Sequence, residues 1–230
     1  MNKEEAIAQK ITRVEEAAGE KVTIEERANI KADALIDFPG WGNVGLPKVL
    51  VKSGVARDSV HILHELVHLE KFFVDQYPII ACGDRSLHLV IGVFKNIPED
   101  YVAHKVILED YDFNPIKETW FSGKDVLNGH HSDKQLAADL IQYHFFVEFC
   151  PDYRNTLNAF KKECEGQQTQ AFLIFDKVVN FTSTIDHRSK ADYTRFVEKF
   201  IEAFEPDYFQ GHRIYPSYFS KERGIWKWNP

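Results

Sequence analysis

Apolar residues recur with a helical period along much of this chain. The first such segment, residues 3–19, is mostly polar and ends at Gly19, so it predicts a polar helix that either covers the core or binds a partner. A second helix is predicted over 22–36, where Thr23 and Glu26 have the spacing of a capping box. A further series of helices is expected in the second half of the chain, at 133–149, 152–165, 168–182 and 188–204.

The middle of the chain has a different pattern. Residues 47–52 predict a short strand that ends at a Ser-Gly pair. The segment from about Asp58 to Asp75 follows, and it is apolar around nearly its whole helical circumference, as is typical of a helix buried inside a domain. Residues 87–94 are apolar and fit either a strand or a helix.

Two further segments, a helix near residue 98 and the C-terminal tail, are distinguished by their residue types. A helix is predicted to begin at 97–100, because Pro98 suits a first turn and the acids after it suit the positive end of the helix dipole. That helix should end near Tyr111. The tail, 205–230, is rich in aromatic residues and is expected to be irregular.

Composition excludes several classes of function. The net charge of −7 and the pI near 5.8 argue against nucleic acid as a partner. The sequence has no apolar stretch of about 18 residues and begins without an apolar leader, so we expect no membrane association and a cytoplasmic location. Its three cysteines form no CxxC pair, which predicts a reducing compartment and no thiolate zinc site.

The chemistry of the chain centres on the buried helix. It contains His64-Glu65-Leu66-Val67-His68, an H-E-x-x-H pattern. On a helix, His64 and His68 lie on one face, one turn apart, so that both imidazoles can bind the same Zn²⁺. Without a metal, burial of two histidines and a carboxylate together would be costly. The pattern therefore predicts a zinc site with one ion per chain.

This segment resembles the active-site helix of the zincin superfamily of zinc metallopeptidases. The resemblance implies that His64 and His68 are zinc ligands and that Glu65 is the general base that activates water. The longer consensus asks for uncharged residues between and after the ligands. Leu66, Val67 and Leu69 comply, whereas Glu70 stands where an apolar residue is usual. The metzincin extension is absent because Val74 stands where its third histidine would be. A third ligand must then come from farther along the chain, as in gluzincins and related families.

The helix predicted over 98–111 is the best source of that ligand. Asp100 and His104 are one turn apart and point along its apolar face, and a polar side chain on such a face needs a partner. We expect His104 to be the third ligand, with Asp100 as its hydrogen-bonding partner. The reverse assignment also stands, as do Glu99 and Glu109 as carboxylate ligands.

Other histidines have weaker claims to a role. His61 shares a face with the two ligand histidines, but its place near a helix end fits a solvated residue. His130 and His131 fit a surface loop, although a histidine in such a loop can stabilise an oxyanion.

These observations predict an α+β fold that is predominantly helical and zincin-like, with a small β-sheet packed beside the H-E-x-x-H helix. We expect a single domain over 1–230, divided into an N-terminal helical extension (1–37), a metal-site core (47–120) and a helical C-terminal subdomain (133–204).

The predicted function is that of a zinc-dependent hydrolase, a metallopeptidase acting on a peptide or protein. The alternative is a zincin-like module that binds a regulatory protein partner and has little or no proteolytic activity. The intact Glu65 favours the enzyme, since a binder has no need of that carboxylate. A metal-free helical protein that carries the pattern by chance is the third interpretation.

Overall fold

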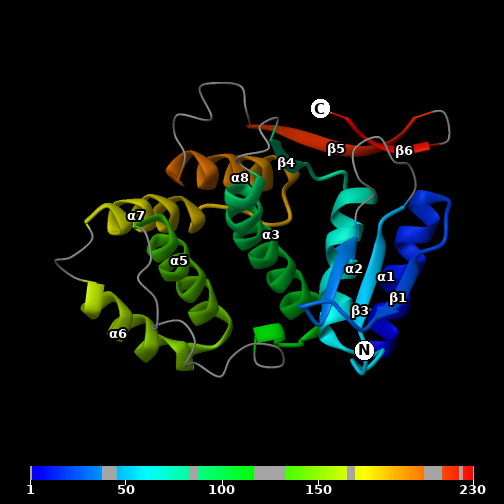
Figure 1. The fold of residues 1–230 in the computed structure, drawn as a ribbon, viewed down its shortest axis with the longest axis horizontal. Helices are drawn as coiled ribbons and strands as arrows, with labels where there is room; N and C mark the ends of the chain where they lie inside the picture. The colour runs from blue at the N-terminus through cyan, green and yellow to red at the C-terminus, as the bar shows by residue number, and fades with distance from the viewer. Residues whose placement is uncertain are drawn as a thin grey trace. The chain divides into compact units, whose positions relative to one another are not determined.

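The computed structural model describes residues 2–37, 46–82, 88–116, 133–164, 169–204, 214–222 and 225–229. Helices make up most of these residues and two small sheets accompany them, so the predicted α+β, predominantly helical class is confirmed (Figure 1). Within these ranges, no helix combines the length and the apolar character needed to cross a membrane.

The elements follow one another along the chain as α1 (Lys3–Ala18), β1 (Thr23–Arg27), β2 (Ala34–Asp37), β3 (Lys48–Lys52), α2 (Val60–Phe73), β4 (Ile79–Cys82), α3 (His88–Tyr111), α5 (Asp133–Phe149), the 3₁₀ helix η2 (Pro151–Tyr153), α6 (Arg154–Cys164), α7 (Thr169–Thr182), α8 (Lys190–Phe204), β5 (Ile214–Glu222) and β6 (Ile225–Asn229).

They form two compact units. The first consists of Met1–Ala81, Ala103–Pro115 and Tyr215–Pro230, and the second of Cys82–Val102 and Ile116–Ile214. Helix α3 is continuous and contributes residues to both units. The division of the chain into domains stays a prediction, and each unit is described by itself.

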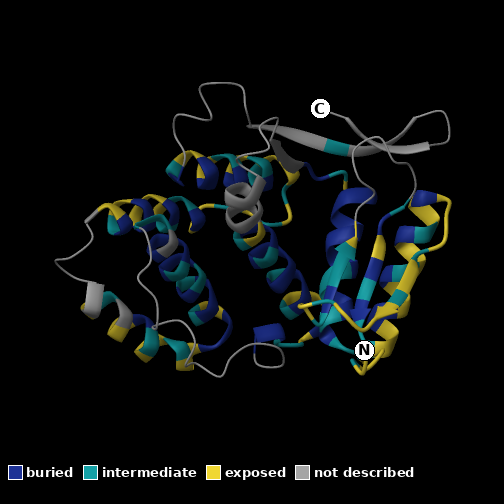
Figure 2. Cartoon of the chain, in the orientation of Figure 1, coloured by how far each residue is buried: buried dark blue, intermediate teal, exposed yellow. Residues whose placement is uncertain are grey.

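Helix α1 begins and ends at well-defined caps. Asn2 accepts a hydrogen bond from the Glu5 backbone N–H at 2.8 Å, and Glu5 accepts one from the Asn2 N–H at 2.9 Å, which completes a capping box. Gly19 ends the helix with a φ of 68°, a left-handed conformation that favours glycine. The predicted end at Gly19 is confirmed. One face of α1 is buried and packs against α2 (Figure 2).

The prediction of a helix over 22–36 is wrong, because this segment forms β1 and β2. Both strands pair with β3, β1 in parallel and β2 antiparallel, giving a sheet with the order β1-β3-β2. The capping-box spacing favours a helix start only locally. Pairing with the distant strand β3 determines the structure of this segment instead. The strand predicted over 47–52 is confirmed as β3, the centre of the sheet.

Helix α2 confirms the predicted buried helix. It begins at Ser59, whose hydroxyl accepts a hydrogen bond from the His61 N–H at 3.2 Å. At the other end, the Gln76 amide donates to the carbonyls of Phe72 and Phe73 at 3.2 Å and 3.0 Å. The helix packs against α1, β2 and β3, so its position is fixed by both the sheet and the N-terminal helix.

Helix α3 begins at His88, about three turns before the predicted start, and Pro98 lies inside it. A proline inside a helix removes one hydrogen bond and costs about 3 kcal/mol. The apolar run before Pro98 and the buried residues from Tyr101 to Ile107 carry the helix through that position. The ambiguous segment 87–94 is therefore mostly helical, and the predicted end at Tyr111 is confirmed.

The prediction of an irregular tail is also wrong. Strands β5 and β6 pair antiparallel, with Tyr218 opposite Asn229 and Glu222 opposite Ile225, and a second sheet has the order β4-β5-β6. Aromatic residues are frequent in this tail, and they favour strands because they pack well on a pleated surface.

The second unit is built from α5, α6, α7, α8 and the first part of α3, and the predicted bounds of its last helices agree with the structure to within two residues. Aromatic rings fill its core, in which Tyr101 lies 4.2 Å from Phe145 and Phe196 lies 6.2 Å from Phe145, both between ring centroids. The Tyr101 hydroxyl donates to Glu148 at 2.9 Å.

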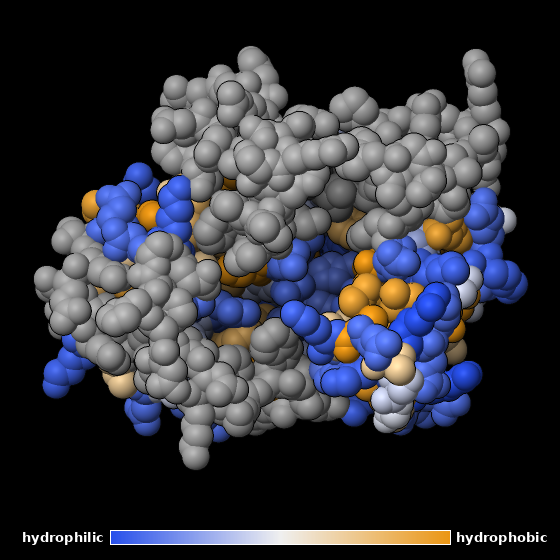
Figure 3. Space-filling view, in the orientation of Figure 1, coloured by the Kyte–Doolittle hydropathy of each residue, from blue (hydrophilic) through white to orange (hydrophobic). Residues whose placement is uncertain are grey.

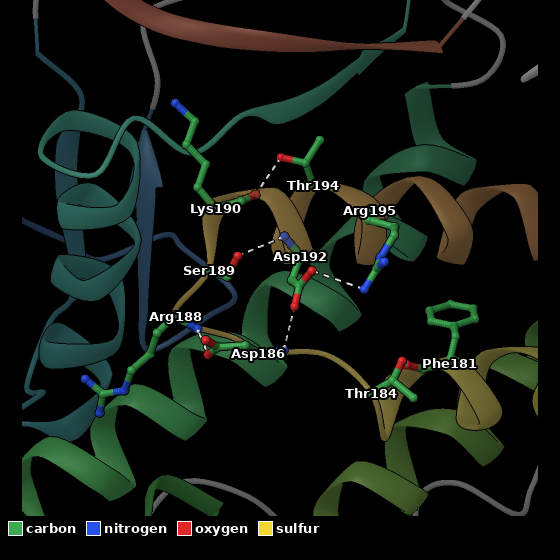
Figure 4. Close-up of polar contacts among 9 residues, drawn as sticks. All are labelled: Phe181, Thr184, Asp186, Arg188, Ser189, Lys190, Asp192, Thr194 and Arg195. Carbon is green, nitrogen blue, oxygen red and sulfur yellow. Dashed lines mark hydrogen bonds and ion pairs between the residues drawn. The ribbon is translucent and has the colours of Figure 1, made fainter.

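In the turn that leads into α8, side-chain oxygens accept hydrogen bonds from backbone N–H groups (Figure 4). Asp192 accepts a hydrogen bond from the Asp186 N–H at 3.2 Å and contacts Arg195 at 3.1 Å, while Ser189 accepts one from the Asp192 N–H at 3.3 Å. Asp186 accepts one from the Arg188 N–H at 2.9 Å. This turn positions α8 for its buried face of six apolar residues, Tyr193, Phe196, Val197, Phe200, Ile201 and Phe204.

His144 of α5 predicts a pH dependence of stability in the second unit. Burial lowers its pKa, and Lys161 adds to this effect while Glu148 opposes it. The folded state therefore binds a proton more weakly than the unfolded state, so stability present above the ordinary pKa of about 6.5 is lost as the pH falls below it.

We expect wild-type protein to lose more thermal stability than His144→Leu when the pH is lowered from about 7.5 to about 5.5. Melting curves of both proteins at the two pH values measure this difference, and His187→Leu is the matched control. Equal losses in the wild type and His144→Leu would contradict the assignment.

Candidate metal centre

Helix α2 holds the H-E-x-x-H residues in the first unit. Leu63, Leu66 and Val67 are fully buried around them, and His68 is itself only 8% exposed. His64 and Glu65 are half-buried, so their side chains keep partial access to solvent. On the surface of this unit, a small group of hydrophobic residues is bordered by hydrophilic ones (Figure 3).

The two histidines of α2 face each other. Their Nε2 atoms are 3.0 Å apart and their ring centroids 4.6 Å apart. Two nitrogens on one tetrahedral zinc, each at about 2.0–2.1 Å from the ion, lie about 3.3 Å apart. A separation of 3.0 Å fits shared ligation with little adjustment, and it also fits a hydrogen bond between two neutral imidazoles.

Asp100 of α3 completes a group of three ligand residues. Ligand atoms of His64, His68 and Asp100 all lie within 4.8 Å of one another. Two imidazoles and one carboxylate are a donor set that zinc accepts, with a fourth position left for water or substrate. The residues present therefore fit a metal ion. The chain therefore contains a group that could hold a metal ion, while occupancy by a metal and its identity stay predictions.

His104, the predicted third ligand, lies beside this group but is not one of its three members. It is 5% exposed, and its ring centroid is 4.8 Å from that of His64. Asp100 lies one turn before it on the same helix. The geometry thus favours the alternative assignment, with Asp100 as ligand, and the role of His104 stays a prediction. Neither Glu99, which is buried, nor Glu109, which is exposed, belongs to the group.

Glu65 flanks the two histidines. Successive residues of an α-helix are about 100° apart, so Glu65 projects about 60° around the axis from His68. A carboxylate there lies at the side of the ligand pair, where it can receive a proton from water without being a ligand itself. Its role as general base stays a prediction.

The remaining histidine of α2 has another partner. His61 Nε2 is 3.2 Å from a carboxylate oxygen of Asp33, and its side chain is partly exposed. The expectation of a solvated residue near the helix end agrees with this partly exposed contact, and His61 does not belong to the group of His64, His68 and Asp100. His130 and His131 lie outside the described residues.

Sequence reasoning missed a buried charge cluster on α2, away from its histidines. Glu70, the residue that departs from the zincin consensus, is 3% exposed and forms an ion pair with Lys10 of α1, which is 2% exposed. Arg13 approaches the other carboxylate oxygen at 2.7 Å. Lys10 also lies 5.5 Å from the Tyr111 ring centroid.

The spacing of residues in α1 indicates this cluster. Ala6, Lys10 and Val14 recur every fourth residue, so the lysine stands in the middle of a buried face. A lysine on such a face is rarely buried unless its charge is paired, so the pattern predicts an acidic partner in the interior.

No family model, no curated protein and no solved structure matches this chain.

Proposed function

We propose that this chain is a metal-dependent hydrolase of the zincin type, with one zinc ion per chain and a peptide or protein as substrate. The observation that carries the proposal is the convergence of His64, His68 and Asp100 within 4.8 Å, with Glu65 next to the first histidine. The packing of α2 against a small sheet supports the zincin-like interpretation of the fold.

The chain's own residues supply most of the proposed chemistry. His64, His68 and Asp100 would hold the ion, which, when bound, lowers the pKa of a water molecule to about 7 and polarises a carbonyl group. Glu65 accepts the proton of the attacking water and delivers it to the leaving amine. The buried leucine and valine side chains around them limit access of bulk water to the reacting groups.

Metal content tests this proposal directly. Full-length protein, purified without a chelator or a histidine tag, should contain about one zinc per chain when measured by inductively coupled plasma mass spectrometry. His64→Ala and His68→Ala should each lose nearly all of it, because two remaining ligands do not hold zinc tightly. Iron and manganese are measured in the same samples, since two histidines and one carboxylate also bind iron(II).

His61→Ala is the matched control, because it removes a histidine from the same helix without touching the metal-binding group. It should retain the wild-type metal content. Circular dichroism of every variant shows that the helices are intact. Wild-type protein that stays metal-free after addition of zinc would overturn the proposal and leave a helical protein without a metal site.

A further inference from the structure

Helix α3 offers the metal site two donors rather than one. Asp100 and His104 are four residues apart, so they stand one above the other on the same face of the helix. Asp100 belongs to the group of three ligand residues, and His104 is buried against His64, with 4.8 Å between their ring centroids. A catalytic zinc site needs three protein ligands, and in this chain a further residue with a ligating nitrogen, His104, lies beside the group of three.

The ring spacing fits a shared ion. Imidazoles on one tetrahedral zinc, bound at about 2.0–2.1 Å, have ring centroids about 5 Å apart. His64 lies 4.6 Å from His68 and 4.8 Å from His104 between centroids. The spacing of the His64 and His104 rings therefore matches that of two imidazoles on one ion, and ligation by His104 would require its ring to turn, because His104 is not one of the three residues whose ligand atoms converge.

We propose that His104 is a fourth, displaceable ligand that closes the metal site at rest. The inference rests on the proposed function and adds a means of regulating it. With His64, His68, Asp100 and His104 all bound, the site has the four protein ligands of a structural zinc centre and no open position. Withdrawal of His104 opens the position that hydrolysis requires. Displacement of this neutral imidazole by water leaves the net charge of the site unchanged.

Cobalt(II) substitution tests the closure without any substrate. The full-length chain is loaded with one equivalent of cobalt, and its visible spectrum is followed as azide is added. Because azide binds only where a coordination position is open, the wild-type spectrum should change little. His104→Ala should still bind cobalt through the other three residues. Its apparent affinity for azide should be at least about tenfold higher than that of the wild type, which corresponds to 1.4 kcal/mol.

His61→Ala serves as the control and should behave as the wild type. His104→Gln repeats the test should the alanine variant fold poorly. Equal azide affinity in the wild type and the variant would overturn the closure and leave the metal site itself standing. Loss of cobalt from His104→Ala would also overturn it, since His104 would then be a required ligand. A wild type that binds no cobalt would overturn the proposed function as well.

Discussion

Replacing Glu65 with glutamine will lower metal-dependent hydrolysis about 10²- to 10⁴-fold while leaving the metal content unchanged. Glutamine has the shape of glutamate but cannot accept the proton of the attacking water. Since Glu65 is not one of the three residues proposed to hold the ion, its replacement should leave ligation intact. The combination of retained metal and lost activity separates a catalytic carboxylate from a structural one.

A mixture of unstructured peptides is a suitable substrate, because the specificity of the site is unassigned. New termini are counted by mass spectrometry with the wild type, with Glu65→Gln and with wild type after removal of the metal. Glu109→Gln is the matched control, since Glu109 is exposed on α3. Equal cleavage by the wild type and Glu65→Gln would contradict the assignment. Metal-loaded wild type that cleaves none of the peptides would favour the alternative of a binding module.

The elements that sequence could predict are those with a local cause. α2 and the last helices carry long periodic patterns, and His64 and His68 are brought together by one helical turn, so both follow from the sequence alone. The prediction of a helix over residues 22–36 is wrong because the structure of this segment depends on pairing with β3, which follows it in the chain. A capping-box spacing carries no information about such a distant partner.

The helical period of apolar residues could not decide which residue is the third candidate ligand. Asp100 and His104 share one face of α3, so the helical period predicts that both point the same way. Which of them places a ligand atom close to both His64 and His68 depends on its distance from that pair along the helix, and a pattern of apolar residues does not contain that distance. The structure selects Asp100 for the group of three ligand residues.

Glu70 departs from the zincin consensus, and this departure has a physical cause in this chain. Replacing it with leucine restores the uncharged residue that the zincin pattern asks for, yet it should lower the free energy of unfolding by about 3–5 kcal/mol. The reason is Lys10, which is 2% exposed and would keep a positive charge in the interior without its partner. Urea denaturation of the wild type and Glu70→Leu, followed by circular dichroism, measures this loss.

Two further variants separate the buried charge from the packing. The double variant Lys10→Met, Glu70→Leu removes both charges and should recover most of the loss, because an apolar pair of similar volume replaces a buried ion pair at little cost. Arg13→Met should lose no more than about 1 kcal/mol, since the Arg13 side chain is 50% exposed and its ion pair is screened by solvent. A Glu70→Leu variant as stable as the wild type would show that Lys10 finds another partner. The expected loss would instead make this ion pair the reason why α1 stays docked on the helix that carries His64 and His68.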